Sequence, residues 1–386
     1  MDKVFLKRTS RVLAGHLWIF SNELVSSPRG HEPGSIVEVC DNKEAFLGIG
    51  YINPNSLIAV RLLTRQREEI NADFFRRRIA EALQYRKRFL PEGVACRLIY
   101  SEGDFLPGLI VDRYAGCLVV QLLTAGMERQ RDLLIGLLDE MLSPEIIVLK
   151  NDNQSRTLEG LALEKILVRG AAGATVSITE GDIHSEVDPM SGQKTGFFLD
   201  QSENRIAFSG LVSGGRGLDL FCYSGAWGLH LAKKGAHVTF VDSSEAAIRQ
   251  TKINAEMNKL TGRCSFIKAD VFNFLKREVD SGNLYDFLVL DPPAFVKSKA
   301  KIKEGLRGYR EINAMAMSII KEGGLIATSS CSHHVDKAVF LDMLQHAAKD
   351  AGRNVRVLEL RSQGRDHPVL LSMPETEYLK CAFIVI

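Results

Sequence analysis

The sequence lacks the cysteine patterns of a disulfide framework or a zinc finger. Its seven cysteines are an odd number, stand far apart and form no C-x-x-C pair, so we expect reduced thiols. Long apolar runs are also absent, since no stretch approaches the roughly 18 residues that would span a bilayer. Charges interrupt the first twenty residues, where a secretion signal would be apolar. We therefore expect a cytoplasmic protein with no membrane partner.

The sequence has almost no net charge, but its charges are unevenly distributed. The 386 residues carry a formal net charge of +2, with 25% charged and 45% hydrophobic residues, as in globular proteins of two or three domains. Residues 61–90 hold nine Arg or Lys against four acids, and residues 294–311 hold six against two. Such stretches favour a polyanion such as nucleic acid, although each alone is equally typical of a solvated helix face. The cations predicted to contact phosphates are Arg76, Arg77, Arg78, Arg86, Lys87 and Arg88.

Hydrophobic periodicity predicts three domains. Residues 1–70 alternate short β-like runs with Gly, Pro and Asn turns, which is typical of a small β-barrel. Residues 71–170 begin with a helix capped by Asn71 or Asp73 and continue as a small α/β domain of four strands and a helix. Residues 171–386 open with a hairpin-like segment, then alternate near-continuous apolar strands with helix-length segments. This last pattern predicts an α/β fold with a parallel, doubly wound, Rossmann-like sheet.

The third domain carries the pattern of a nucleotide-like cofactor site. Asp219 ends its first strand and Asp242 ends the next, 23 positions later, close to the roughly 20 residues that place a carboxylate on a bound ribose. The turn between them, "FCYSGAWG", lacks the three glycines that let a pyrophosphate approach a helix N-terminus. S-adenosylmethionine has a ribose and an adenine but no phosphate, so Ser224 and Gly225 suffice near its amino acid end.

Asp270 ends the third strand and is predicted to accept a hydrogen bond from the adenine amine. The neighbouring residues Phe221, Ser243 and Val271 are assigned to the same cofactor pocket. The alternative is that these acids only cap helices, which three acids in register make less attractive.

The fourth strand ends in "DPPAF", residues 291–295. The proline pair makes the backbone rigid and extended, at the sheet edge where ligands of α/β proteins bind. We predict that Phe295 stacks on a flat ring and that Asp291 or carbonyls at Pro292 hydrogen-bond it. Asp291 would also border the cofactor.

The fifth strand, preceded by the turn-like "KEGG" at 321–324, ends in "SSCSHH". A zinc site needs about four ligands and C-x-H-H supplies three at most, so we expect no metal. A buried, inert thiol is the common fate of cysteine. We predict that fate for Cys40, Cys96, Cys117, Cys264 and Cys381, and a packing role for Cys222.

Cys331 differs because it lies where cofactor and target base would meet. Its thiolate could attack C6 of a pyrimidine and turn C5 into a nucleophile for the methyl group. His333 and His334 are adjacent on an extended segment and point to opposite faces, so at most one would face this site.

The chain resembles bacterial ribosomal RNA cytosine-C5 methyltransferases that carry an N-terminal PUA domain, and its third domain resembles class I S-adenosylmethionine-dependent methyltransferases. The matching stretches are "KRTSRVLAGHLWIFSNEL", "GQKTGFFLDQSENR", "DLFCYSGAWG", "DPPAF", "RGYREIN", "SCS" and "DHPVLLSMPETEYLK". The resemblance implies a PUA-like RNA-binding domain over 1–70, a small α/β domain over 71–170 and the methyltransferase domain over 171–386. It implies large-subunit ribosomal RNA as partner, S-adenosylmethionine as cofactor and Cys331 as nucleophile, with Asp219, Asp242, Asp270 and Asp291 lining the pockets.

Two other functions stay open. Asp-Pro-Pro followed by an aromatic residue is also how amine methyltransferases grip adenine or guanine, so a base nitrogen is the alternative target. A non-catalytic RNA-binding assembly factor that keeps the cofactor fold is the third. Many related RNA cytosine-C5 enzymes have a second cysteine where this chain has "DPPAF", so the group that takes the C5 proton is open. The sequence leaves a homodimer open as well.

Overall fold

The computed structural model describes residues 1–296 and 298–386 and divides the chain into two compact units. The first unit consists of Met1–Val176, Val187–Leu199 and Arg365–Thr376, and the second of Ser177–Glu186, Asp200–Gly364 and Glu377–Ile386. Lys297, which belongs to the second basic stretch, lies outside the described residues.

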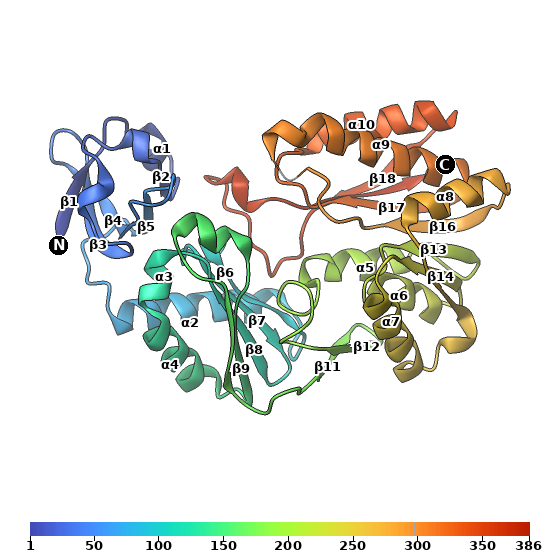
Figure 1. The fold of residues 1–386 in the computed structure, drawn as a ribbon, viewed down its shortest axis with the longest axis horizontal. Coiled ribbons are helices and arrows are strands. Elements are labelled where there is room, and N and C mark those ends of the chain that lie inside the picture. The colour runs from blue at the N-terminus through green and yellow to red at the C-terminus, as the bar shows by residue number, and fades with distance from the viewer. Residues whose placement is uncertain (297) are drawn as a thin grey trace. The chain divides into compact units, whose positions relative to one another are not determined.

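A small β-sheet forms the N-terminal part of the first unit (Figure 1). Its strands, in spatial order, are β1 (Asp2–Phe5), β3 (Ser35–Cys40), β4 (Phe46–Ile52), β5 (Val60–Thr64) and β2 (Trp18–Ile19). β1 runs parallel to β3 and the other pairs are antiparallel. A short helix, α1 (Ser10–Leu13), follows β1. Val37, Ile52 and Val60 lie in its core, to which Met373 from the C-terminal segment of this unit contributes.

The rest of the first unit is a second sheet with helices packed on it. Its strands, in spatial order, are β10 (Glu164–Arg169), β9 (Ile146–Asn151), β8 (Cys117–Leu122), β7 (Leu109–Tyr114) and β6 (Cys96–Tyr100). The helices are α2 (Ala72–Phe89), α3 (Ala125–Arg129) and α4 (Arg131–Leu142). Asn71 caps α2 as predicted, since its side chain accepts hydrogen bonds from the backbone N–H groups of Asp73 and Phe74, both at 3.1 Å.

A seven-stranded sheet forms the centre of the second unit. Its strands, in spatial order, are β15 (Cys264–Lys268), β14 (His237–Asp242), β13 (Arg216–Leu220), β16 (Tyr285–Leu290), β17 (Ile320–Ser330), β19 (Lys380–Val385) and β18 (Arg356–Arg361). β15 to β17 are parallel, but β19 is antiparallel to both of its neighbours. The prediction of a wholly parallel sheet is therefore wrong at β19. No crossover helix links β18 to β19 in the described chain, and without one neighbouring strands pair antiparallel.

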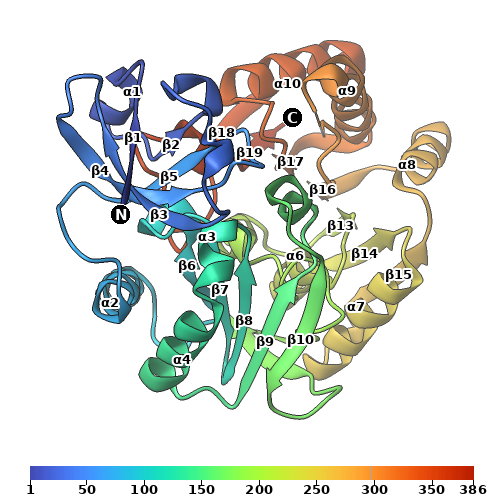
Figure 2. The same cartoon turned by 60° about the vertical axis from the view of Figure 1, so that its left-hand side comes forward.

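Side chains on the two faces of this sheet belong to two separate hydrophobic cores. One face, with Leu218 and Leu290, packs against α8 (Val271–Asp280), α9 (Ile302–Ser318) and α10 (Lys337–Ala351). The other face, with Phe240 and Val289, packs against α5 (Ser202–Ser209), α6 (Ala226–Lys233) and α7 (Glu245–Met257). Figures 1 and 2 show α9 and α10 on one side of these strands and α6 and α7 on the other. This is the doubly wound arrangement predicted from the apolar strands.

Two further local findings bear on the sequence predictions. The hairpin expected after residue 171 is present as β11 (Val176–Glu180) and β12 (Ile183–Val187). The segment "KEGG" does not precede the fifth strand as a turn but lies inside β17, where the pairing with β16 shifts register. Gly323 there has a φ of +76°, a conformation that glycine tolerates. In the described part of the chain, no helix has both the length and the apolar character to cross a membrane.

Candidate functional site

The turn after β13 has an unusual backbone that α7 holds in place. Phe221, Tyr223 and Gly225 have φ angles of +61°, +48° and +79°, values that are uncommon for residues other than glycine and that cluster at functional sites. A Cβ at Gly225 would lie 2.4 Å from Thr251 Cγ2, so only glycine fits. Thr251 Oγ1 donates to the carbonyl of Tyr223 at 2.9 Å, and Asn254 Nδ2 donates to that of Ser224 at 2.9 Å.

Asp219 is buried beneath this turn with one oxygen unsatisfied. Its Oδ2 accepts a hydrogen bond from Gly228 N at 2.8 Å. Its Oδ1 has no hydrogen-bond partner among the described residues. Burial, followed by the negative charges of Asp291 and Asp242, raises the pKa of Asp219 to about 7. A buried acceptor without a partner is costly, so this oxygen suits a ligand that brings a donor or a cation.

Asp242, at the end of β14, helps to hold the same turn. Its Oδ2 accepts from Tyr223 N at 3.1 Å and its Oδ1 accepts from Ser244 N at 2.9 Å. The side chain is partly exposed, and each carboxylate oxygen can accept a second hydrogen bond. Asp242 can therefore still receive hydroxyl groups of a ligand. Ser243, assigned to the same pocket, is exposed.

Asp270 caps a helix, which was the alternative to cofactor binding for the acids at the strand ends. Its Oδ1 accepts from Asn273 N at 3.0 Å at the start of α8. The side chain is exposed, and its second oxygen can still accept a hydrogen bond. Val271, the first residue of α8, is buried in the core beside it.

Asp291 follows β16 and is held by two side chains that the sequence analysis did not select. Gln201 Nε2 donates to Asp291 Oδ1 at 3.0 Å, and Trp227 Nε1 donates to Asp291 Oδ2 at 3.1 Å. Gln201 also donates to Ser329 Oγ at 3.1 Å, which ties Asp291 to the end of β17. Burial, with the charge of Asp200, raises the pKa of Asp291. The position of Gln201 within "GFFLDQSENR" was a sequence signal that could have identified it.

Phe295 belongs to an aromatic cluster beside Asp291. Its ring centroid lies 4.6 Å from that of Tyr309, 6.0 Å from that of Phe272 and 6.3 Å from that of Phe221. A pocket of about 350 Å³ is lined by Phe272, Pro293, Ala294, Phe295, Glu304, Gly305 and Gly308. Pro292, the predicted substrate contact, is buried, while Pro293 is exposed. The side chains available to a flat ring here are therefore Pro293 and Phe295.

Cys331 directly follows β17 and is half-buried. The next residue, Ser332, is fixed from several sides. Its hydroxyl lies 3.0 Å from the Tyr309 hydroxyl and accepts from Val296 N at 3.3 Å, and its carbonyl accepts from Lys380 Nζ at 2.7 Å. Because β16 and β17 are parallel and Leu290 pairs with Thr328, Asp291 and Cys331 leave the sheet at the same edge.

The histidines after Cys331 are both exposed, and the ring of His333 stacks on Tyr378 with centroids 5.5 Å apart. Cys40, Cys96, Cys117, Cys222 and Cys381 are buried, as predicted. Cys264 is only half-buried on the edge strand β15, so the prediction of a buried thiol is wrong there. Burial raises the pKa of the Cys381 thiol to about 12. Among the described residues, no group of three or more His, Cys, Asp or Glu side chains could hold a metal ion.

The three arginines selected on α2 are engaged in ion pairs within the first unit. Arg76 pairs with Glu140 at 2.7 Å and Arg77 with Glu68 at 2.6 Å, while Arg78 pairs with Glu81 at 3.1 Å. These contacts leave the side chains of Arg76 and Arg77 partly exposed, but they reduce the positive potential offered to a phosphate.

Arg86 cannot contact a phosphate, contrary to the prediction. Its side chain is buried and pairs with Asp104 at 2.5 Å. It also donates to the carbonyls of Arg97 at 2.8 Å and Asp366 at 2.7 Å. The residue lies on the inward face of α2, so it satisfies backbone groups of the first unit instead of facing water.

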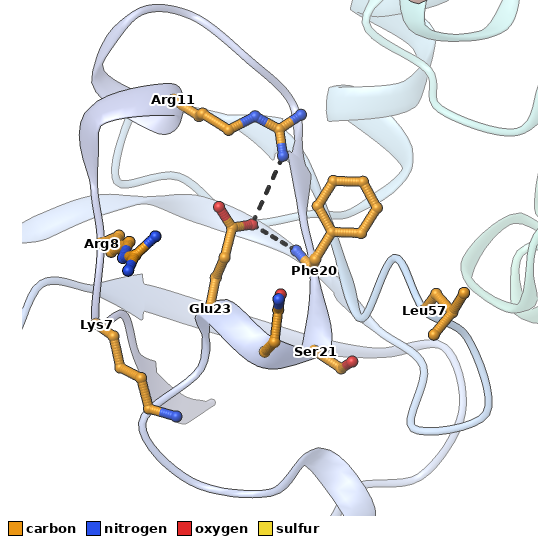
Figure 3. A pocket seen from close by; sticks show the side chains of 8 residues that line it. Lys7, Arg8, Arg11, Phe20, Ser21, Glu23 and Leu57 are labelled. Atoms are coloured by element: carbon orange, nitrogen blue, oxygen red, sulfur yellow. Dashed lines mark hydrogen bonds and ion pairs between the residues drawn. The ribbon is translucent and has the colours of Figure 1, made fainter. Parts of the chain in front are cut away.

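A pocket of about 560 Å³ in the N-terminal sheet domain was not predicted (Figure 3). It is lined by Lys7, Arg8, Arg11, Phe20, Ser21, Asn22, Glu23 and Leu57. Glu23 accepts from Phe20 N at 2.7 Å and lies 3.8 Å from Arg11, whose guanidinium is 4.9 Å from the Phe20 ring centroid. Lys7 and Arg8 are exposed. Within the described residues, Glu23 lies within ion-pair distance of Arg11 and not of Lys7 or Arg8, so these two exposed side chains are available cations.

Comparison with known proteins assigns the chain to a family. The ribosomal RNA large subunit methyltransferase I of Shewanella denitrificans is 39% identical over 373 residues, which cover 95% of this chain and 94% of that protein. The protein of the same name from Photobacterium profundum is 39% identical over 374 residues, with the same coverage. The chain belongs to the ribosomal RNA large subunit methyltransferase I family. Within this family member, residues 3–65 match a PUA-like domain, and residues 199–360 match the family described as Conserved hypothetical protein 95.

Solved structures confirm the fold class of this large subunit methyltransferase I family member. A SAM-dependent methyltransferase from Streptococcus mutans has a TM-score of 0.86 at 22% identity, over 100% of both chains. A methyltransferase in complex with SAH has a TM-score of 0.87 at 21% identity, also over 100% of both chains. The predicted class I methyltransferase sheet, preceded by a small PUA-like β-domain and a small α/β domain, is therefore present.

Proposed function

We propose that the chain methylates C5 of a cytosine in large-subunit ribosomal RNA, with S-adenosylmethionine as methyl donor and Cys331 as covalent nucleophile. The names of its relatives support the RNA and the methyl transfer. The observation that carries the choice of C5 is the half-buried thiol of Cys331 at the same sheet edge as Asp291. Base nitrogens need no such thiol, whereas an unactivated pyrimidine carbon requires covalent activation.

The residues around the turn after β13 fit S-adenosylmethionine. The unsatisfied Oδ1 of Asp219 suits the ammonium of its amino acid end. Asp242 would accept from the ribose hydroxyls and Asp270 from the adenine amine, while the remaining assigned residues border the pocket: Phe221, Ser224, Gly225, Ser243 and Val271. When bound, the cofactor supplies an electrophilic methyl group on a sulfonium.

Cys331 would begin the reaction by forming a bond from Sγ to C6 of the cytosine. The electron pair of the C5–C6 double bond moves to C5, which then takes the methyl group. Loss of the C5 proton restores the double bond and expels the Cys331 thiolate. Asp291, held by Gln201 and Trp227, would accept from the exocyclic amine of the base, and Phe295 would stack on its ring.

We place contacts to the RNA backbone on the N-terminal pocket as well as on α2. Lys7 and Arg8 are exposed cations at a pocket that also offers the Phe20 ring, a combination suited to phosphate and base. Arg76, Arg77 and Arg78 stay in the proposal as weaker contacts, because each already pairs with an acid. The borders of the three domains, at about residues 70 and 170, are likewise proposed.

Replacing Cys331 with alanine tests the proposed nucleophile. Cys331→Ala should abolish methyl transfer to ribosomal RNA fragments while S-adenosylhomocysteine still binds by calorimetry. Cys264→Ala, which removes another half-buried thiol, is the matched control and should stay active. Normal methylation by Cys331→Ala would replace the C5 assignment with a base nitrogen. Failure of the wild-type chain to bind S-adenosylhomocysteine would favour an assembly factor without catalysis.

A further inference from the structure

Lys380 places a buried ammonium group behind the segment that carries Cys331. It is the first residue of β19 and pairs in register with Ser330, the residue before Cys331. Only 3% of Lys380 is exposed. Its Nζ donates to the carbonyl of Ser332 at 2.7 Å and to that of Tyr378 at 2.8 Å. The ammonium is thus fixed against the residue that follows the thiol.

A buried ammonium group normally has an anionic partner, because carbonyl groups alone do not offset the loss of water. Within the described residues, no carboxylate lies within ion-pair distance of Lys380 Nζ. Glu377, on the preceding segment, pairs instead with Lys337 at 2.6 Å. The ammonium therefore forms no ion pair with a carboxylate among the described residues, and the carbonyl that it contacts belongs to the residue after Cys331.

Burial and the neighbouring negative charges have opposite effects on the pKa of Lys380. Burial lowers the pKa of Lys380 to about 8, and negative charge on Cys331, Asp336 and Glu377 opposes that shift. Tyr309, from α9, approaches the same segment, and burial raises its pKa. A negative charge on Cys331 raises the pKa of both Lys380 and Tyr309. The thiol is therefore electrostatically coupled to these two side chains.

We infer that Lys380 is a positioning residue whose ammonium keeps Cys331 in the thiolate form. The inference rests on the proposed role of Cys331 as nucleophile. A thiol with its ordinary pKa of about 8.5 is only a few per cent ionised at neutral pH, and a fixed cation nearby favours the thiolate. The coupling is mutual, since an ionised Cys331 also favours the charged form of Lys380. The thiol proton leaves to solvent.

The test measures the thiol itself. Alkylation of Cys331 by iodoacetamide is followed in the full chain as a function of pH, with the Cys331 peptide quantified by mass spectrometry. Lys380→Met, which keeps an unbranched side chain but removes the charge, should raise the midpoint by about one unit and slow alkylation at pH 7 roughly tenfold. Lys380→Arg should keep the wild-type midpoint. Lys321→Met is the matched control, because Lys321 lies on β17 at the end remote from Cys331, and it should change nothing.

Two outcomes would overturn the inference. One is an unchanged midpoint in a folded Lys380→Met variant. The other needs no variant: a wild-type midpoint at or above the ordinary value of about 8.5 would show that Cys331 is not stabilised as a thiolate, even if Lys380→Met did not fold. Failure of the proposed function is distinguishable. If Cys331→Ala still methylated RNA while Lys380→Met shifted the alkylation midpoint, the electrostatic coupling would stand and the nucleophile assignment would fall.

Discussion

Gly228 N donates a hydrogen bond to Asp219 Oδ2 over 2.8 Å, and within the described residues this is the only hydrogen bond that the buried carboxylate receives. Burial raises the pKa of Asp219 to about 7. A cofactor ammonium would interact more strongly with the ionised form than with the neutral acid. We therefore expect the affinity for S-adenosylhomocysteine to increase as the pH rises from 6 to 8, measured by calorimetry.

Asp219→Asn provides the control for this pH dependence. The variant should bind more weakly and lose the pH dependence, because its side chain does not titrate. In the ligand-free wild type, the raised pKa contributes stability that is full below about pH 4 and is lost as the pH rises through about 7. Urea unfolding should therefore show Asp219→Asn gaining stability relative to wild type between pH 5 and pH 8. A pH-independent difference between the two would contradict the assignment.

Asp242 should contribute to cofactor binding through the ribose. Removing a charged acceptor costs about 1.5 to 3 kcal/mol, so Asp242→Ala should weaken S-adenosylhomocysteine binding about tenfold or more. Asp286→Ala removes a carboxylate from the opposite end of the parallel strands, where it pairs with Lys321, and should leave the affinity unchanged. If folded Asp242→Ala bound S-adenosylhomocysteine as tightly as wild type, the end of β14 would not be part of the cofactor site.

Gln201 should matter for methyl transfer more than for cofactor binding. Its amide joins Asp291 to Ser329 across the ends of β16 and β17. Among the described residues, Gln201→Leu would leave Trp227 as the remaining side-chain donor to Asp291. We expect the rate of methyl transfer at saturating cofactor to fall about fivefold, since loss of one hydrogen bond costs about 1 kcal/mol, with S-adenosylhomocysteine affinity within about twofold of wild type. An unchanged rate would show that the orientation of Asp291 is not needed.

The two basic surfaces should differ in their effect on RNA binding. Replacing Lys7 and Arg8 with glutamine should weaken binding and reduce the salt slope by up to about one unit per lost phosphate contact. The same change at Arg76 and Arg77 should have a smaller effect, because both already pair with acids. Salt titrations of filter binding measure both slopes. If the Arg76 and Arg77 variant lost more RNA affinity than the Lys7 and Arg8 variant, α2 would be the main RNA contact.

The fold could be predicted where local chemistry and hydrophobic pattern agreed. Asn71 precedes an amphipathic segment and caps α2 as expected. Asp242 ends β14 as expected, and Asp219 is the penultimate residue of β13, so that strand ends one position later than predicted. The strands β10 and β18 were not predicted, because they are edge strands with largely exposed side chains. Their apolar residues, such as Ile166 and Val168 in β10 and Val357 and Leu360 in β18, are few, lie between charged residues and remain exposed, so neither segment shows the near-continuous apolar run from which the other strands were predicted.

Tertiary contacts explain the remaining errors. Arg86 looked like a member of a basic helix face, but its hydrogen bond to the carbonyl of Asp366 joins segments 280 positions apart. Lys380 likewise becomes a neighbour of Ser332 only because β19 pairs with β17. The strand-end acids could be found from spacing, whereas the side chains that hold them come from distant parts of the chain.

Covalent trapping tests the central claim most directly. A large-subunit ribosomal RNA fragment that carries 5-fluorocytosine at the target position is incubated with the chain and S-adenosylmethionine, and the products are separated under denaturing conditions. Fluorine cannot leave C5 as a cation, so the account predicts a stable protein–RNA adduct that mass spectrometry locates at Cys331, and no adduct with Cys331→Ala. Methylation of the unmodified fragment without any adduct to the fluorinated one would contradict the account.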